Sequence, residues 1–132
     1  MQLSCIYNGE NLDIKEIIKN KNIKLTSARK EILDIFFTAT KPLSYEEVRD
    51  DISMDKATFY RNIIKFENEK IINSFESSDK KRYYEIKQLP HPHFICAQCH
   101  RVECIKKEFE FNLEGYAIEN IILKGKCPAC IA

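Results

Sequence analysis

Two C-x-x-C pairs near the end of the chain constrain its fold more than any other feature. Cys96 and Cys99 form the first pair, and Cys127 and Cys130 form the second. Two thiolates spaced in this way on a tight turn can bind one cation, and two such pairs complete a tetrahedral site. No β-α-β pattern of the thioredoxin type surrounds either pair, which disfavours a redox dithiol over a metal site, although two short disulfides stay as an alternative. The pairs therefore predict a structural zinc that stabilises a small β-rich domain.

The composition narrows the class of protein. A chain of 132 residues makes one ordinary domain, or two small ones joined by a linker. Its 21 basic and 20 acidic residues give a net charge of +1, which excludes a uniformly basic, nucleic-acid-coating protein but allows a local basic face. No apolar run approaches the ~20 residues of a membrane span, and no signal peptide is visible at the start. We expect a cytoplasmic protein without a membrane partner, in which paired cysteines indicate metal before disulfides.

In the first two thirds of the chain, the apolar residues first follow helical spacing and then alternate with polar residues as in strands. Apolar spacing predicts one helix over residues 12–18 and a second that begins after Thr26. A capping box at Ser44 predicts a short helix to about Ile52, and Asp55 caps a fourth. Residues 71–75 and 82–86 then alternate as two strands.

Helices followed by a hairpin predict a winged helix-turn-helix, so the fold class is α+β. We expect a winged-helix domain at residues 1–86, a proline-containing hinge at 87–92, and a small α/β dimerisation and zinc-binding domain at 93–132.

The fourth helix is the expected DNA-reading element. Phe59, Ile63 and Phe66 form its inward face, and no acid occurs between residues 56 and 65. Arg61 could contact guanine or phosphate, and Tyr60 could contact phosphate or a thymine methyl; the alternative is that Tyr60 packs in the core and the lysines serve solubility. The predicted DNA-binding residues are Thr26, Arg29, Lys56, Thr58, Tyr60, Arg61, Lys65, Lys80 and Lys81.

Three segments together resemble the ferric uptake regulator family, whose members are bacterial metal- or peroxide-responsive repressors that bind DNA as dimers. They are Leu25-Thr26-Ser27-Ala28-Arg29, Ala57-Thr58-Phe59-Tyr60-Arg61, and His91-Pro92-His93-Phe94-Ile95-Cys96-Ala97-Gln98-Cys99. The resemblance implies a homodimer that binds operator DNA, a four-cysteine structural zinc and a regulatory metal site at the hinge. It implies neither an enzyme nor a small-molecule substrate.

For the regulatory site the resemblance implies Glu85, His91 and His93 as ligands. The family's further carboxylate position, five residues after the second zinc cysteine, is here Cys104, with Glu103 beside it as a substitute ligand. One oxygen, two nitrogens and one sulfur suit tetrahedral zinc better than ferrous iron, so we hypothesise zinc sensing, as in zinc uptake regulators, with iron or manganese as alternatives. The further histidine that many iron sensors add is replaced by Lys41. In the alternative reading, Cys104 is a small buried residue.

Other sequence features define the rival functions and the remaining expectations. A zinc deaminase requires a His-x-Glu motif that is absent, and no His-Glu-x-x-His occurs. A thiol redox switch involving Cys5 or Cys104 and a zinc-ribbon adaptor are the other rivals. The family's second regulatory site would fall on Pro90, Pro92 and Glu119, and because prolines cannot ligate we expect no such site. We expect dimerisation through strands within residues 116–123, after a segment at 106–115 that is short for the family.

Overall fold

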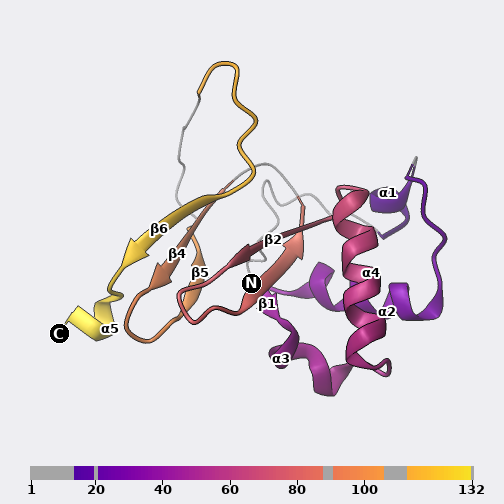
Figure 1. The fold of residues 1–132 in the computed structure, drawn as a ribbon, viewed down its shortest axis with the longest axis horizontal. Coiled ribbons are helices and arrows are strands. Elements are labelled where there is room, and N and C mark those ends of the chain that lie inside the picture. Colours follow the sequence, from indigo (N-terminus) through magenta and orange to yellow (C-terminus); the bar gives the residue numbers. More distant parts are fainter. Residues whose placement is uncertain (1–13, 20, 88–90, 106–112, 132) are drawn as a thin grey trace.

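The computed structural model describes residues 14–19, 21–87, 91–105 and 113–131. In chain order the elements are α1 (Ile14–Ile18), α2 (Ser27–Thr38), β1 (Leu43–Ser44), α3 (Tyr45–Val48), the 3-10 helix η2 (Arg49–Asp51), α4 (Lys56–Asn68), β2 (Ile72–Glu76), β3 (Arg82–Ile86), β4 (Pro92–Cys96), β5 (Val102–Cys104), β6 (Ile121–Gly125) and α5 (Pro128–Ile131). The helices α1–α4 lie at one side of the molecule and the sheet of β4–β6 at the other (Figure 1). The predicted α+β fold is confirmed.

The helices begin where the sequence places their caps. Oγ1 of Thr26 accepts a hydrogen bond from the Arg29 N–H at 3.2 Å, and Oδ1 of Asp55 accepts one from the Thr58 N–H at 2.8 Å. The hydrogen bonds at Thr58 also lower the pKa of Asp55. Ser44 and Glu47 form the predicted capping box. Each such cap contributes about 1 kcal/mol, because it satisfies N–H groups that have no partner within the helix.

Two predicted elements differ in extent. The short third helix is α-helical only to Val48 and continues as η2, so it does not reach Ile52 as an α-helix. The last strand begins at Ile121, although alternation predicts strand from Tyr116. The reason is its partner: Pro92, the first residue of β4, lies opposite Ile121, so earlier residues have no β4 residue to pair with. Leu12 and residues 106–112, for which a helix start and a short segment are expected, lie outside the described residues.

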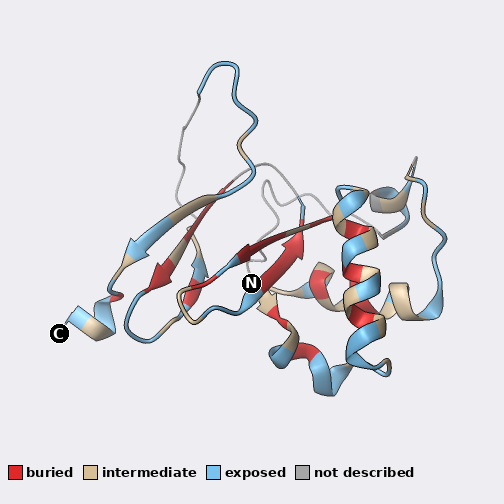
Figure 2. Cartoon of the chain, in the orientation of Figure 1, coloured by how far each residue is buried: buried red, intermediate tan, exposed pale blue. Residues whose placement is uncertain are grey.

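The first sheet and the helices enclose the main hydrophobic core. Its strand order is β1-β3-β2, with both pairs antiparallel. The buried faces of α2, α4 and β3 meet in this core (Figure 2). Phe59 of α4 lies at its centre, with no exposed surface and with the rings of Phe36, Tyr45 and Tyr84 within 6.5 Å between centroids. This packing fixes α4 by one face and leaves the opposite face to solvent.

The second sheet has the order β5-β4-β6, with β5 antiparallel and β6 parallel to β4. A second hydrophobic cluster joins it to the β2–β3 hairpin: Phe75 and Tyr83 of the hairpin pack with Ile95 and Val102 of the sheet, and Ile122 lies against them. The hairpin is therefore held against the second sheet, and β3 lies between the two hydrophobic clusters.

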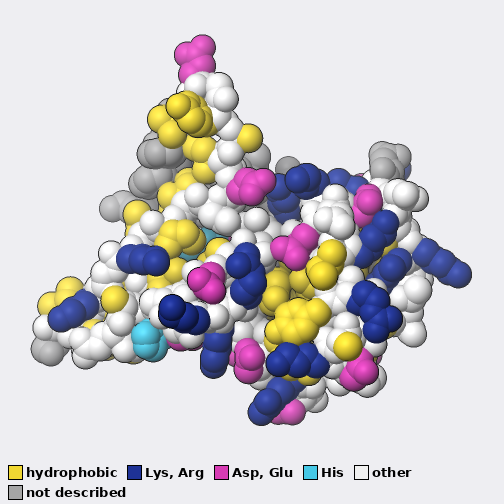
Figure 3. All heavy atoms as spheres, viewed as in Figure 1, with side chains coloured by type: hydrophobic (Ala, Val, Ile, Leu, Met, Phe, Trp, Pro, Cys, Tyr) yellow, Lys and Arg dark blue, Asp and Glu magenta, His cyan; other side chains and the backbone are white. Residues whose placement is uncertain are grey.

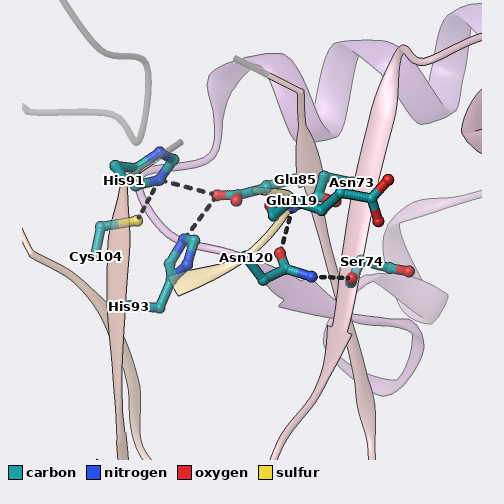
Figure 4. Close-up of polar contacts among 8 residues, drawn as sticks. All are labelled: Asn73, Ser74, Glu85, His91, His93, Cys104, Glu119 and Asn120. Atoms are coloured by element: carbon teal, nitrogen blue, oxygen red, sulfur yellow. Dashed lines mark hydrogen bonds and ion pairs between the residues drawn. The ribbon is translucent and has the colours of Figure 1, made fainter. Parts of the chain in front are cut away.

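Polar contacts add to this attachment at two places. Nδ2 of Asn73 donates to Oδ1 of Asn120 at 2.6 Å, and Nδ2 of Asn120 donates to the carbonyl of Ser74 at 3.3 Å (Figure 4). In the hairpin loop, Oγ of Ser78 lies 2.8 Å from Nδ1 of His100 and donates to the Cys96 carbonyl at 3.2 Å. No described helix is long and apolar enough to cross a membrane.

Candidate metal centres and nucleic-acid interface

The four paired cysteines converge on one point. Cys96 ends β4, Cys99 lies in the turn after it, Cys127 precedes α5, and Cys130 lies within α5. All four are free thiols whose sulfur atoms lie within 4.8 Å of one another. The sulfurs of Cys99 and Cys127 are 3.8 Å apart. A tetrahedron with Zn–S bonds of about 2.3 Å has edges of about 3.8 Å, so this cluster fits a four-cysteine zinc site.

Backbone N–H groups stabilise the thiolate form of one of these cysteines, which is the form that binds metal. Sγ of Cys96 accepts from the N–H groups of Cys99, Cys127 and Gln98, each at 3.4 Å, and these bonds lower the pKa of Cys96 to about 5. The thiol of Cys130 is hydrogen-bonded to Cys127, which together with desolvation raises its pKa to about 12. His100 has φ +64 and supplies the left-handed residue of this turn; its side chain contacts Ser78.

A second cluster lies where the two sheets meet. It consists of Glu85 on β3, His91 just before β4, His93 on β4 and Cys104 on β5, with one potential ligand atom from each within 4.8 Å of the others. Their side chains point toward one another in Figure 4. Oε2 of Glu85 is 3.0 Å from Nε2 of His93 and 3.4 Å from Nε2 of His91, and the Cys104 sulfur is 3.7 Å from the same His91 nitrogen.

Strand register explains this convergence. His93 and Cys104 are directly opposite in the antiparallel β4–β5 pair, so their side chains lie on the same face of the sheet. Glu85, His91 and His93 are all buried. Burial raises the pKa of Glu85, but the hydrogen bonds to His91 and His93 outweigh it, and the pKa is lower than usual. The carboxylate is thus ready to bind a cation together with two imidazoles.

The second ring nitrogen of His93, Nδ1, is buried without a hydrogen bond to any of the described residues. The ring stacks on Phe75 at 4.9 Å between centroids. Packing on Phe75 and the Nε2 contact with Glu85, rather than any hydrogen bond at Nδ1, therefore hold this imidazole in place. Oxygen, nitrogen, nitrogen and sulfur donors at these spacings fit a small divalent metal.

The bonding of Cys104 and the position of Glu103 both differ from the predicted ligand roles. Cys104 is in a disulfide, in which its sulfur cannot act as a thiolate ligand. Glu103, the predicted substitute ligand, is not in the cluster: it is exposed, and its Oε1 lies 3.3 Å from Nη1 of Arg101. Alternation along β5 directs Glu103 away from Cys104, so a one-residue substitution of ligands would require the strand to shift its register.

The further metal-ligand positions that the family resemblance implies lie outside the second cluster or outside the described residues. Lys41 is exposed and lies 3.6 Å from Glu47. Glu119 is exposed, and its backbone carbonyl accepts a hydrogen bond from Asn73. Pro92 is buried at the start of β4, and Pro90 lies outside the described residues.

The solvent-facing side of α4 differs in part from the prediction. Arg61 is exposed, whereas Thr58, Tyr60 and Lys65 are half-buried. Lys65 lies 3.5 Å from Glu69. The ring of Tyr60 packs on Tyr45 of α3 at 5.6 Å, and burial raises its pKa. Sequence periodicity could not reveal this contact, because it comes from another helix. The residues that do form the outermost line of α4 are Ala57, Arg61, Ile64 and Asn68, all exposed; helical spacing alone could have found this line.

The other predicted DNA contacts come from the start of α2, the start of α4 and the β2–β3 loop. Thr26 is the cap of α2, and the guanidinium of Arg29 donates to Oδ1 of Asn62 and to the Lys24 carbonyl. Nζ of Lys56 lies above the Tyr45 and Tyr60 rings, at 5.4 and 5.9 Å from their centroids. Lys80 and Lys81 are exposed in the β2–β3 loop. Lys and Arg side chains gather over the helical part of the molecule, with hydrophobic atoms among them (Figure 3).

Comparison with known proteins places this arrangement in a family. Residues 20–120 match the sequence model of the Ferric uptake regulator family. The chain is 35% identical to the ferric uptake regulation protein of Cupriavidus metallidurans, covering 83% of this chain and 88% of that protein. It is 30% identical to the corresponding protein of Neisseria meningitidis, covering 87% and 91%. The structure of the ferric uptake regulator of Francisella tularensis, solved with iron, aligns with a TM-score of 0.64 and 25% identity over 84% of this chain and 96% of that chain. The chain is therefore a metal-responsive transcriptional regulator of the ferric uptake regulator family.

Proposed function

We propose that the chain is a zinc-responsive repressor that binds operator DNA as a homodimer. The observation that supports this most directly is the origin of the second cluster: Glu85 comes from the first sheet, and His91, His93 and Cys104 come from the second sheet or its edge. A metal bound there would connect the DNA-binding part, residues 1–86, with the dimerisation part, residues 93–132, across the hinge at 87–92. Metal binding would thereby set the relative orientation of the two DNA-reading helices of a dimer.

The donor set supports zinc over other divalent metals. Zinc accepts four mixed ligands in a tetrahedron, including a thiolate, whereas iron and manganese in carboxylate-rich sites take more ligands. With Glu103 directed away and Lys41 paired with Glu47, the described residues provide four donors once Cys104 is reduced to a thiol. Bound zinc supplies positive charge and fixed geometry. The four-cysteine site serves as the structural zinc in this proposal, and the second site serves as the sensor.

The DNA-binding surface would use α4 and its surroundings. Arg61 is exposed on the outermost line of the helix, where it can contact guanine or phosphate in the major groove. Lys80 and Lys81, in the exposed loop of the hairpin, would contact backbone phosphates and make binding depend on salt. Arg29 and Lys56 are already bound within the chain, so we assign them to positioning α2 and α4 and, at most, to phosphate contacts.

A gel-shift and metal-titration experiment tests the proposal. The reduced protein, with its four-cysteine site filled, is titrated with zinc, ferrous iron and manganese, and binding to duplexes selected from a random pool is measured at each step. We expect zinc-dependent, salt-sensitive binding, with two zinc ions per chain at saturation. Arg61→Ala should abolish the shift without changing the zinc content. If iron or manganese promotes DNA binding at lower concentration than zinc does, that metal and not zinc is the one sensed. DNA binding that is unchanged by all three metals would contradict metal regulation through this site.

A thiol redox regulator is a second candidate function, favoured by the disulfide at Cys104. The four cysteines of the C-x-x-C pairs are free, and the one other cysteine of the sequence is Cys5, which lies outside the described residues. In this candidate function, Cys5 and Cys104 would act as the redox pair. In the reaction, both thiols lose a proton and an electron to a peroxide, which is reduced to two waters, or to one water and an alcohol. The disulfide and metal ligation compete for the same sulfur, so oxidation would weaken metal binding at the second cluster.

Thiol counting and metal titration distinguish this candidate. In the wild type, peroxide should remove two titratable thiols and weaken binding of the second metal, and dithiothreitol should restore both. Cys5→Ser should keep metal binding unchanged by brief peroxide treatment, because no partner is present for Cys104. If the oxidised and reduced proteins bind the second metal equally, Cys104 neither ligates the metal nor controls its binding.

A further inference from the structure

An isoleucine lies in the middle of the solvent-facing line of α4. The four residues on this line follow the i, i+4, i+7, i+11 spacing of one helical face, and all are exposed: Ala57, Arg61, Ile64 and Asn68. Ile64 leaves 56% of its surface to solvent. In residues 21–87 and 91–105, the only other exposed large hydrophobic residue is Leu25, which precedes α2 and leaves a smaller share, 36%, of its surface to solvent. Ile64 is thus the one large apolar side chain that the proposed DNA-reading face presents outward.

Neither packing nor helix propensity accounts for isoleucine at this position. The core contacts of α4 are made by Phe59, Ile63 and Phe66 on the opposite face. A β-branched residue is a poorer helix former than alanine or lysine, and at an exposed site no packing compensates for it. A single exposed hydrophobic residue is not a site by itself, because such residues are common on protein surfaces. The argument therefore depends on what surrounds Ile64.

The charges around Ile64 favour contact with the major groove of DNA. Arg61 lies one turn before it and Lys65 beside it, and no acidic residue occurs from Lys56 to Phe66. This surface attracts phosphates, so an approaching duplex would bring base edges to the outermost line of the helix. The thymine methyl is the one apolar group among the base edges of the major groove, and apolar side chains recognise it. Tyr60, the residue predicted for that contact, is instead half-buried against Tyr45.

We infer that Ile64 contacts thymine methyl groups in the major groove and helps to set the base preference of this regulator. The inference rests on the proposed DNA-binding function and names the residue that reads a particular base. Arg61 and Ile64 then divide the recognition: Arg61 supplies hydrogen bonds to guanine or phosphate, and Ile64 supplies an apolar contact one turn further along the helix.

Replacing thymine by uracil tests this contact, because uracil lacks only the methyl group. The duplex that the zinc-loaded, full-length wild type selects from a random pool is synthesised with each thymine changed to uracil in turn. Binding is measured by fluorescence anisotropy for the wild type, Ile64→Ala and Ile64→Val. Alanine favours the helix, so loss of binding by Ile64→Ala would not come from unfolding. Valine keeps a β-branched apolar surface and serves as the matched control.

We expect the wild type and Ile64→Val to lose about fourfold in affinity at one or two thymines per half-site, as burial of one methyl group implies. Ile64→Ala should bind the thymine duplex more weakly than the wild type and lose nothing further on change to uracil at those positions. Equal uracil sensitivity in Ile64→Ala and the wild type, or none in the wild type, would overturn the inference while leaving DNA binding intact. Failure of the wild type to select any duplex would instead overturn the proposed function, and the inference with it.

Discussion

Oε2 of Glu85 lies 3.0 Å from Nε2 of His93, and this pair connects β3 of the first sheet with β4 of the second. Both side chains are buried, and the contact between them reduces the cost of burying the Glu85 carboxylate and the His93 Nε2 atom. The pair thus holds two donors of the second cluster in position before any metal binds. Pre-positioned donors of this kind reduce the ordering that metal binding must otherwise bring about.

Glu85→Gln is expected to weaken metal binding at the second cluster by at least about tenfold, since changes even to residues behind the ligands cost ten- to hundredfold. Glutamine keeps the size and one oxygen of the side chain but removes the charge. A competition titration with a chromogenic chelator measures the affinity of the second metal while the four-cysteine site stays filled. Glu103→Gln is the matched control, because Glu103 is exposed and contacts Arg101. Equal affinities for the two variants would remove Glu85 from the site.

Helix starts, the four-cysteine cluster and the His-x-His pair could be predicted from sequence because local chemistry determines them. Thr26, Ser44 and Asp55 cap helices through groups three residues away, and those spacings are visible in the sequence. The cysteine pairs carry their own geometry in the same way. The His-x-His pair places two side chains on the same side of a strand, and only its partners, Glu85 and Cys104, had to be supplied by family resemblance.

Contacts between distant elements were beyond the sequence. In β3 the residues from Tyr83 to Ile86 are all buried, so alternation could not show which side faces which neighbour. The structure divides them: Tyr84 and Ile86 pack in the helical core, and Tyr83 packs against the second sheet. For the same reason the spacing within α4 could not show that Tyr45 partly covers Tyr60. Tertiary packing decides such questions, and a single sequence contains no record of it.

Cys96 is expected to give the zinc-free protein a thiolate at neutral pH. Backbone N–H groups from Cys99, Cys127 and Gln98 lower its pKa from the ordinary 9.0 to about 5. Because the folded pKa is depressed, this contribution to folding stability is fully present above the ordinary pKa and is lost as the pH falls through about 5. Ultraviolet thiolate absorbance of zinc-free protein, with circular dichroism to follow the fold, should show a step near pH 5.

Two variants give this pH prediction its controls. Cys96→Ser should lose the step near pH 5. Cys130→Ser should keep it, because the pKa of Cys130 is raised to about 12 and this thiol carries no charge at neutral pH. A zinc-free wild type that stays folded and shows no thiolate between pH 6 and 7 would contradict the assigned hydrogen bonds.

Phe59→Ala is expected to destabilise the protein by about 3–5 kcal/mol, the usual cost of truncating a fully buried phenylalanine. Phe59 has no exposed surface, and the rings of Tyr45, Tyr60 and Tyr84 lie 5.0, 5.4 and 6.0 Å from its own. The cavity would open beneath α4, so the proposed DNA-reading helix would lose its support against the core. Urea unfolding at one protein concentration, with zinc in excess throughout, measures the free energy of unfolding. Ile64→Ala, on the opposite face of the same helix, should change it by no more than about 0.5 kcal/mol. If the two variants were equally stable, Phe59 would not be the centre of the core and the assignment of the outward face of α4 would fail with it.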